Sequence, residues 1–228
     1  MIKKVQLAGP SGIGKTTIAT SGIYPFVSAS VSDLLPKTKD TKHSDMLSRD
    51  SKELLMEDYQ VLNLRNKLFN SLGNVDYISD RSFLDLAAYF YLKQSGKIPA
   101  CELETFLTLC KNSLCETCTH LVLFDFLPEQ LREWVIEDNN KRITSNYFQL
   151  EIAEIMKLIL KLWGYEYKDY IYKLGIGNNL KYGAKEGIIS SIHGEVRVLI
   201  LRELNLDNRL KIINKFLNNE KTNRFSIF

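Results

Sequence analysis

One short segment near the start of the chain restricts the possible folds more than any other. Residues 9–17 read Gly-Pro-Ser-Gly-Ile-Gly-Lys-Thr-Thr, a full match to G-x-x-x-x-G-K-[ST], directly after an apolar run at residues 2–8. In such a segment a buried strand turns into a helix, and backbone N–H groups and the positive end of the helix dipole point at one anion. The pattern predicts a strand, a phosphate-binding loop and a helix in that order. It also predicts that the chain binds a nucleoside triphosphate.

Each fixed position of this loop has a physical reason. Glycines allow the tight turn, the ammonium group of Lys15 suits the β- and γ-phosphate oxygens, and the Thr16 hydroxyl is a predicted ligand of Mg²⁺. A chance glycine-rich turn is the alternative, but it does not account for the strand before the loop and the helix after it. The residues expected to contact the nucleotide are Gly9, Ser11, Gly12, Ile13, Gly14, Lys15, Thr16 and Thr17.

The rest of the chain alternates between apolar runs and stretches of helical period, which is typical of a parallel sheet covered by helices. Residues 121–127 are almost continuously apolar, which fits a strand buried on both faces. The predicted strands are residues 2–8, 24–31, 75–79, 121–127 and 196–201, and the predicted helices include residues 14–21, 50–72, 101–114, 145–163 and 207–217. We therefore expect a single three-layer α/β domain over residues 1–228, with a parallel sheet of about five strands and helices on both faces.

Two segments fit this alternation less well. Residues 32–50 are polar, and their place after a predicted strand near the phosphate loop predicts a loop that faces the acceptor substrate. Residues 165–194 begin with an aromatic stretch that fits a strand and continue rich in glycine and asparagine. We interpret residues 165–194 as an insertion near the C-terminus.

Composition excludes some classes of partner. The chain has 30 basic and 27 acidic residues, so its net charge of +3 gives little support for binding to nucleic acid. No stretch approaches about 18 uncharged apolar residues, and the first strand lacks the features of a signal peptide, so we expect no membrane contact and a cytoplasmic protein. The composition is compatible with a homodimer, and the oligomeric state is left open.

The cysteines allow two interpretations. Cys110, Cys115 and Cys118 form, with His120, the pattern C-x4-C-x2-C-x-H, which is similar to a zinc ligand set. The alternative, which we favour, is a set of reduced thiols packed along a helix and the turn before a buried strand.

A second motif narrows the function. The run Asp80-Arg81-Ser82-Phe83-Leu84-Asp85-Leu86-Ala87-Ala88-Tyr89 follows the predicted strand at residues 75–79. Open α/β sheets bind ligands at the carboxyl ends of their strands. An acid there can orient an acceptor or hold Mg²⁺, and an adjacent guanidinium can bind a phosphate through two hydrogen bonds. The alternative is an Asp-Arg pair on the surface at a helix N-terminus, with core residues behind it.

Together the two motifs resemble the nucleoside and nucleotide kinase branch of the phosphate-loop proteins. Thymidylate kinases have a D-R-[YH] opening followed by Ala-Tyr, and ribosylnicotinamide kinase-like proteins and their phage-encoded relatives have D-R-S followed by an Asp and Ala-Tyr. The chain departs from thymidylate kinases at Ser82, where an aromatic residue or His is usual. Residues 165–194 have no counterpart in the family. The matching positions are Asp80, Arg81, Ser82, Asp85, Ala88 and Tyr89.

The resemblance implies ATP and Mg²⁺ as cofactors and a small lid at about residues 128–145. It implies catalytic roles for Lys15, Asp80, Arg81 and Arg142, and a triphosphate contact from Arg132. The predicted substrate-binding residues are Asp33, Arg49, Arg81, Ser82 and Asp85, although residues 30–33 lack the Glu or Arg-Glu element that many relatives use for the acceptor. The predicted metal-site residues are Thr16, Asp80 and Asp125.

The expected function is phosphoryl transfer from ATP to a small acceptor, in first place a (deoxy)nucleoside monophosphate. A nucleoside or ribosyl-cofactor acceptor is the first alternative, and a kinase acting on DNA or on a modified base is the second. A nucleotide-dependent switch is the third, but the chain lacks the Asn-Lys-x-Asp run of guanine-specific switches.

Overall fold

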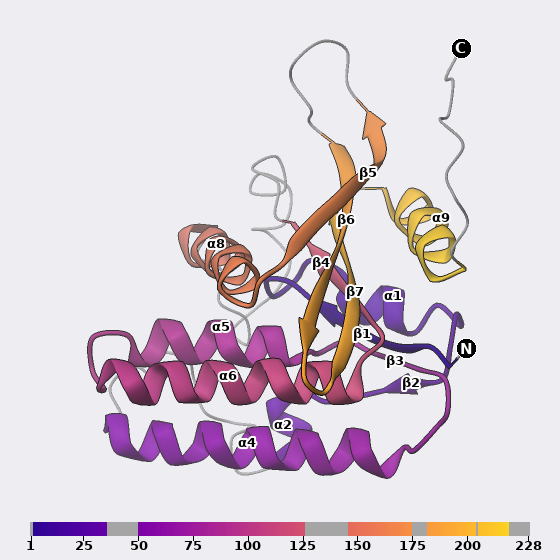
Figure 1. Cartoon of the computed structure of the whole chain (residues 1–228). Coiled ribbons are helices and arrows are strands. Elements are labelled where there is room, and N and C mark those ends of the chain that lie inside the picture. Colours follow the sequence, from indigo (N-terminus) through magenta and orange to yellow (C-terminus); the bar gives the residue numbers. More distant parts are fainter. Residues whose placement is uncertain (1, 36–49, 126–145, 175–181, 204, 219–228) are drawn as a thin grey trace, which may run out of the picture.

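A twisted sheet lies at the centre of the molecule (Figure 1). The computed structural model describes residues 2–35, 50–125, 146–174, 182–203 and 205–218. Within these residues the sheet has seven strands in the order β2-β3-β1-β4-β7-β6-β5. The strands are β1 Lys4–Ala8, β2 Phe26–Val27, β3 Tyr77–Ser79, β4 His120–Phe124, β5 Glu166–Leu174, β6 Tyr182–Ser191 and β7 Gly194–Arg202.

The first five strands in this order are parallel, β6 pairs antiparallel with β7, and β5 pairs antiparallel with β6. The expected α/β fold with a mostly parallel sheet is confirmed. Within the segment that we interpret as an insertion, residues 166–174 and 182–191 form β5 and β6, which extend the same sheet. The aromatic stretch after residue 165 forms the strand that its composition allowed.

Helices cover both faces of the sheet. The helices are α1 Lys15–Ala19, α2 Val31–Leu34, α4 Ser51–Ser71, α5 Phe83–Gln94, α6 Ala100–Thr117, α8 Asn146–Leu162 and α9 Leu206–Leu217. Residues of α1 and α9 share one apolar cluster with the sheet, whereas residues of α4, α5, α6 and α8 share the other. The strand β4 contributes side chains to both clusters. Leu121 and Leu123 belong to one cluster, whereas Val122 and Phe124 point to the opposite face and belong to the other.

The order of the strands brings two distant loops together. In the sheet β1 lies between β3 and β4, so connections from β1 lead to both sides, and Gln6 is level with Ser79 of β3 and Leu121 of β4. Such a change of direction opens a crevice at the carboxyl ends of the strands, where open α/β sheets bind ligands. The phosphate-loop motif follows β1, and the segment that begins with Asp80 follows β3.

The region around residues 24–35 differs from the expectation. The predicted strand at residues 24–31 is reduced to the two residues of β2, and the short helix α2 follows it. Ser30 caps this helix, because its side chain accepts a hydrogen bond from the backbone N–H of Asp33. A serine with a nearby acid favours a helix start over continued pairing in the sheet. The predicted lid at residues 128–145 lies outside the described residues.

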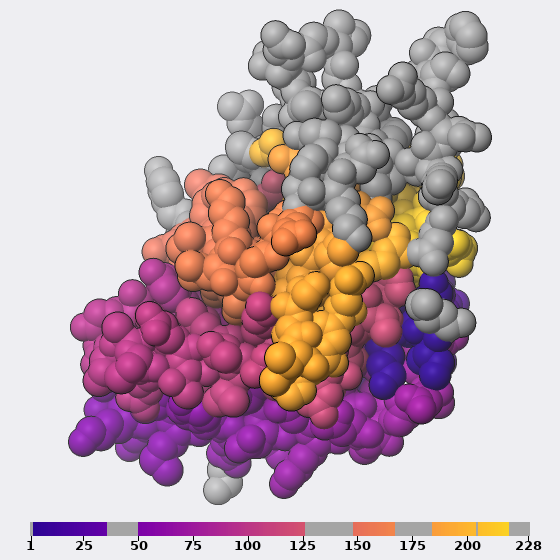
Figure 2. Space-filling view, viewed as in Figure 1, coloured from indigo at the N-terminus to yellow at the C-terminus, as the bar shows by residue number. Residues whose placement is uncertain are grey.

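The turn between β6 and β7 lies against α6, and Figure 2 shows this hairpin standing over the layer of α5 and α6, with α4 beneath. Gly194 has a positive φ of 144°, and a Cβ atom there would lie 3.0 Å from the carbonyl oxygen of Cys115. Glycine at this position therefore allows the close approach to α6. No helix among the described residues has the length and the apolar character needed to cross a membrane.

Candidate functional site

The phosphate-loop motif forms a tight turn between β1 and α1. Gly9, Gly12 and Gly14 all have positive φ, from 80° to 144°, in the region that favours glycine. A Cβ atom at Gly9 would also lie 3.1 Å from the carbonyl oxygen of Phe124, the last residue of β4. The glycines of the motif therefore serve both the turn itself and its contact with the neighbouring strand.

Lys15 lies deeper than expected. A lysine that binds triphosphate is expected at the surface, but Lys15 is only 5% exposed. Its ammonium group donates to the backbone carbonyls of Gly9 and Pro10, the latter at 2.8 Å, and lies 3.9 Å from Asp85 Oδ1. The ammonium group is thus turned back toward the loop and the start of α5.

Thr16 and Asp80 connect the two motifs. The Thr16 hydroxyl donates a hydrogen bond of 2.7 Å to Asp80 Oδ2, from α1 to the carboxyl end of β3. Asp80 is 7% exposed, and its other oxygen, Oδ1, is buried without a hydrogen-bond partner. A hydroxyl beside a buried carboxylate with a spare oxygen is the donor set that Mg²⁺ prefers, so Thr16 and Asp80 fit the expected ion.

Ser82 and Asp85 have structural partners. They form a capping box at the start of α5: Asp85 Oδ2 accepts from the backbone N–H and the hydroxyl of Ser82, and the Ser82 hydroxyl accepts from the backbone N–H of Asp85. Asp85 Oδ1 accepts from the backbone N–H of Gly9 at 3.3 Å. Both side chains are buried, so the expected substrate contacts from Ser82 and Asp85 stay predictions, while their contacts in the structure join α5 to the phosphate loop.

Arg81 is half-buried at the same edge of the sheet. Among the described residues, no carboxylate lies within ion-pair distance of its guanidinium. It is close enough to lower the pKa of Arg65 and to offset part of the rise in the pKa of Tyr89, which burial raises to about 12. Arg81 is thus a partly exposed positive charge at the carboxyl ends of the strands, without an ion-pair partner among the described residues.

A second arginine, Arg65 of α4, was not predicted from the sequence. It is 2% exposed and donates to the carbonyls of Ser82 and Ala29 at 2.6 and 2.9 Å, so it ties the loop after β2 to the segment after β3. Burial lowers the pKa of Arg65 to about 10. The burial of Arg65 could have been predicted from its position on the apolar stripe of α4, between Leu62 and Phe69.

A third arginine supports the phosphate loop from the opposite layer. Arg209 of α9 is buried, and its guanidinium donates to the carbonyls of Ile13, at 2.6 Å, and Glu203. The same group lies over the ring of Phe124, 5.3 Å from its centre. Burial lowers the pKa of Arg209. The resemblance pointed to the segment around this residue but did not predict the contact with the loop.

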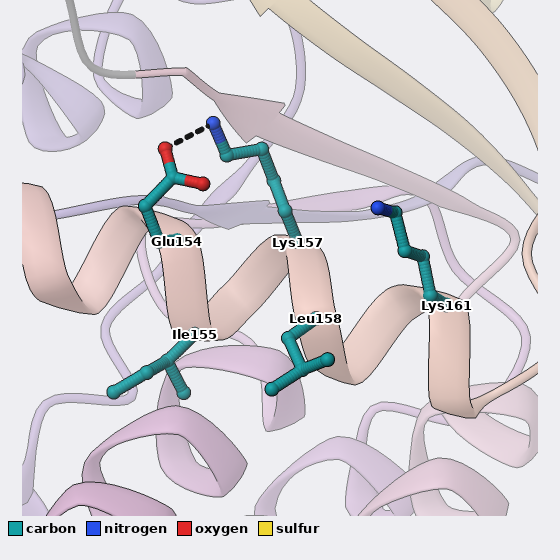
Figure 3. A pocket seen from close by; sticks show the side chains of 5 residues that line it. All are labelled: Glu154, Ile155, Lys157, Leu158 and Lys161. Carbon is teal, nitrogen blue, oxygen red and sulfur yellow. Dashed lines mark ion pairs between the residues drawn. The ribbon is translucent and has the colours of Figure 1, made fainter.

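Asp125 follows β4 at the same edge but has other partners than Thr16. Its carboxylate pairs with Lys157 of α8 at 3.2 Å and with Arg202 at 3.8 Å. Lys157 also pairs with Glu154 at 2.6 Å (Figure 3). Of the two acids expected near the metal, Asp80 is therefore the one hydrogen-bonded to Thr16. A hollow of about 330 Å³ lies along this part of α8, lined by Glu154, Ile155, Lys157, Leu158 and Lys161.

Among the described residues, the structure does not bring the remaining predicted site residue, Asp33, together with Thr16 and Asp80. Asp33 is exposed and accepts hydrogen bonds from Ser28 and Ser30, so it belongs to the start of α2. Arg49, Arg132 and Arg142 lie outside the described residues.

The structure does not assemble the cysteine motif into a metal site. All four cysteines are free, and burial raises the pKa of Cys110 and Cys118. Within the described ranges, no three His, Cys, Asp or Glu side chains are grouped so that they could hold a metal ion.

Comparison with known proteins adds no family assignment. No protein-family model matches the sequence, and no curated protein matches it either.

Proposed function

We propose that this protein is a phosphate-loop kinase that transfers a phosphoryl group from ATP, with Mg²⁺, to a small nucleotide or nucleoside. The observation that supports the proposal best is the hydrogen bond of 2.7 Å between Thr16 and Asp80. It joins the donor motif after β1 to the acceptor motif after β3. A γ-phosphoryl group can pass only between sites that share one crevice.

The roles follow from the position of each group. The loop amides and Lys15 would bind the donor phosphates, and Thr16 and Asp80 would hold Mg²⁺ directly or through water. The ion, when bound, neutralises charge on the phosphates. Asp80 would also orient the attacking oxygen of the acceptor, which is a phosphate oxygen in a nucleoside monophosphate and a hydroxyl in a nucleoside. These assignments use hard oxygen ligands and backbone donors, as phosphoryl transfer requires.

The charge at the crevice favours an anionic acceptor. Arg81 has no carboxylate partner among the described residues, and a guanidinium suits a phosphate because it donates two parallel hydrogen bonds. A (deoxy)nucleoside monophosphate meets this requirement better than a neutral nucleoside. Arg81 would then bind the phosphate that the acceptor already carries.

A transfer assay tests the proposal. Wild-type protein is incubated with Mg²⁺, labelled ATP and a panel of nucleosides, ribosyl compounds and nucleoside monophosphates, and labelled products are separated. We expect a labelled diphosphate from at least one monophosphate. Lys15→Ala should lose about 10²–10³-fold in turnover, since it removes a charge that faces the phosphates, while its far-ultraviolet circular dichroism stays that of the wild type.

Two outcomes would contradict the proposal. ATP hydrolysis without transfer to any acceptor would favour the nucleotide-dependent switch. Wild-type turnover in folded Lys15→Ala would show that the loop does not position the donor.

A further inference from the structure

The carboxylate of Asp85 divides its two oxygens between two structural units. Oδ2 accepts from the backbone N–H and the hydroxyl of Ser82 at 2.9 and 2.7 Å, within the capping box of α5. Oδ1 faces the phosphate loop, where it lies 3.3 Å from the Gly9 backbone nitrogen and 3.9 Å from Lys15 Nζ. The side chain is 3% exposed. One buried charge is therefore fixed by a helix start and directed at the loop lysine.

This position conflicts with a bound triphosphate. A buried ammonium group is stable only beside opposite charge or strong acceptors, and Lys15 finds both in Asp85 and the carbonyls of Gly9 and Pro10. Triphosphate oxygens would offer the same ammonium group a larger negative charge. They would also bring that charge close to the buried carboxylate, and like charges in a medium of low dielectric repel strongly.

We propose that Asp85 is a positioning residue that competes with the triphosphate for Lys15 and thereby lowers nucleotide affinity. The inference rests on the proposed function for the identity of the competing ligand. Asp85 holds the lysine and the Gly9 amide when no nucleotide is bound, and nucleotide binding draws Lys15 away from it. The sequence motif alone suggested a substrate contact for Asp85; its burial and its contact with Gly9 indicate this other role.

The test compares charge at position 85 with nucleotide affinity. Calorimetric titration with a non-hydrolysable ATP analogue and Mg²⁺ is carried out on wild type, Asp85→Asn and Asp85→Glu. We expect Asp85→Asn to bind roughly five- to twentyfold more tightly, because both the competition and the repulsion are removed. Asp85→Glu keeps the charge and the capping box, so its affinity should return toward that of the wild type.

A matched control separates this effect from the loss of any buried acid. Asp58 of α4 is also buried and pairs with Lys93 of α5, far along the helices from the loop. Asp58→Asn should lower the melting temperature of the free and the nucleotide-bound protein equally, and it should leave the affinity for the analogue unchanged. Asp85→Asn should instead lower the melting temperature of the free protein and increase the upward shift caused by the analogue.

The outcomes also separate this inference from the proposed function. If the wild type does not bind the analogue, both fail. If the wild type binds and Asp85→Asn binds equally or more weakly, the competition is refuted while the kinase proposal stands. Hydrogen exchange without nucleotide provides a second measurement: we expect faster exchange at residues 9–15 in Asp85→Asn, and an unchanged rate there would also refute the inference.

Discussion

At the scale of single residues, the two acids that follow β3, Asp80 and Asp85, differ in whether one carboxylate oxygen is left without a hydrogen-bond partner. Asp85 uses both oxygens, whereas Asp80 uses Oδ2 for the Thr16 hydroxyl and keeps Oδ1 buried without a partner. A buried polar atom without a partner is costly, so its presence at the carboxyl edge of the sheet calls for an explanation. A bound cation would satisfy it.

We expect Asp80→Asn to lower turnover about 10²–10³-fold with little loss of stability. An asparagine oxygen still accepts the Thr16 hydroxyl, but the charge that would bind Mg²⁺ is gone. The measurement is steady-state transfer at several Mg²⁺ concentrations. A matched control is Asp76→Asn, since Asp76 lies at the opposite end of β3, is exposed and accepts a hydrogen bond from the backbone N–H of Lys3. Equal losses in both variants would contradict the role of Asp80.

At the scale of elements, the sequence predicted long helices and strands with a regular apolar period better than short or irregular segments. The helix predicted for residues 50–72 is α4, capped by Asp50, and the strand predicted for residues 196–201 lies within β7, because long periodic stretches and capping residues act locally. The length of the strand predicted for residues 24–31 was overestimated, because β2 covers only Phe26–Val27 and Ser30 caps the helix α2.

Long-range contacts could not be predicted from the sequence. Nothing in the pattern indicates that β5 and β6 extend the sheet, or that Arg65 and Arg209 lie under the loops of the crevice. The two motifs were predicted to share one crevice, and the Thr16–Asp80 contact agrees with that geometry. The capping box formed by Ser82 and Asp85 was not predicted, because a capping box and a substrate contact use the same residue types.

The contact between α9 and the phosphate loop gives a prediction at this scale. Arg209→Met should lower the free energy of unfolding by about 2–4 kcal/mol, because the carbonyls of Ile13 and Glu203 lose a buried donor. It should also weaken binding of the ATP analogue. Urea unfolding and calorimetry measure the two effects. Lys211→Met, on the exposed side of α9, is the control and should change neither. An unchanged affinity in a folded Arg209→Met protein would show that α9 does not support the loop.

At the scale of the whole molecule, a neutral histidine lies in the middle of the sheet. His120 begins β4, is 2% exposed, and packs against the ring of Phe216 with centres 5.3 Å apart. Burial, with smaller contributions from Arg197 and Lys3, lowers its pKa to about 3. In the unfolded chain a histidine has a pKa of about 6.5.

Acid should therefore unfold the protein partly through His120. Below about pH 6.5 the unfolded chain binds a proton that the folded protein does not, so stability is full above that pH and declines as the pH falls toward 3. The contribution to the slope is up to about 1.4 kcal/mol per pH unit. Urea unfolding at pH 7, 6, 5 and 4 should show a smaller decline for His120→Asn than for the wild type. His193→Asn, at the exposed β6–β7 turn, should keep the wild-type slope.

The contact of Arg209 with Ile13 also has a consequence for how the protein is made. The phosphate-loop motif leaves the ribosome before its neighbours Asp80, Asp85, Phe124 and Arg209, the last of which lies 196 residues after Ile13. Non-local contacts of this kind form late in folding. A nascent chain that ends before α9 therefore lacks the donor that holds the Ile13 carbonyl, and the loop gains this support only after α9 has been made.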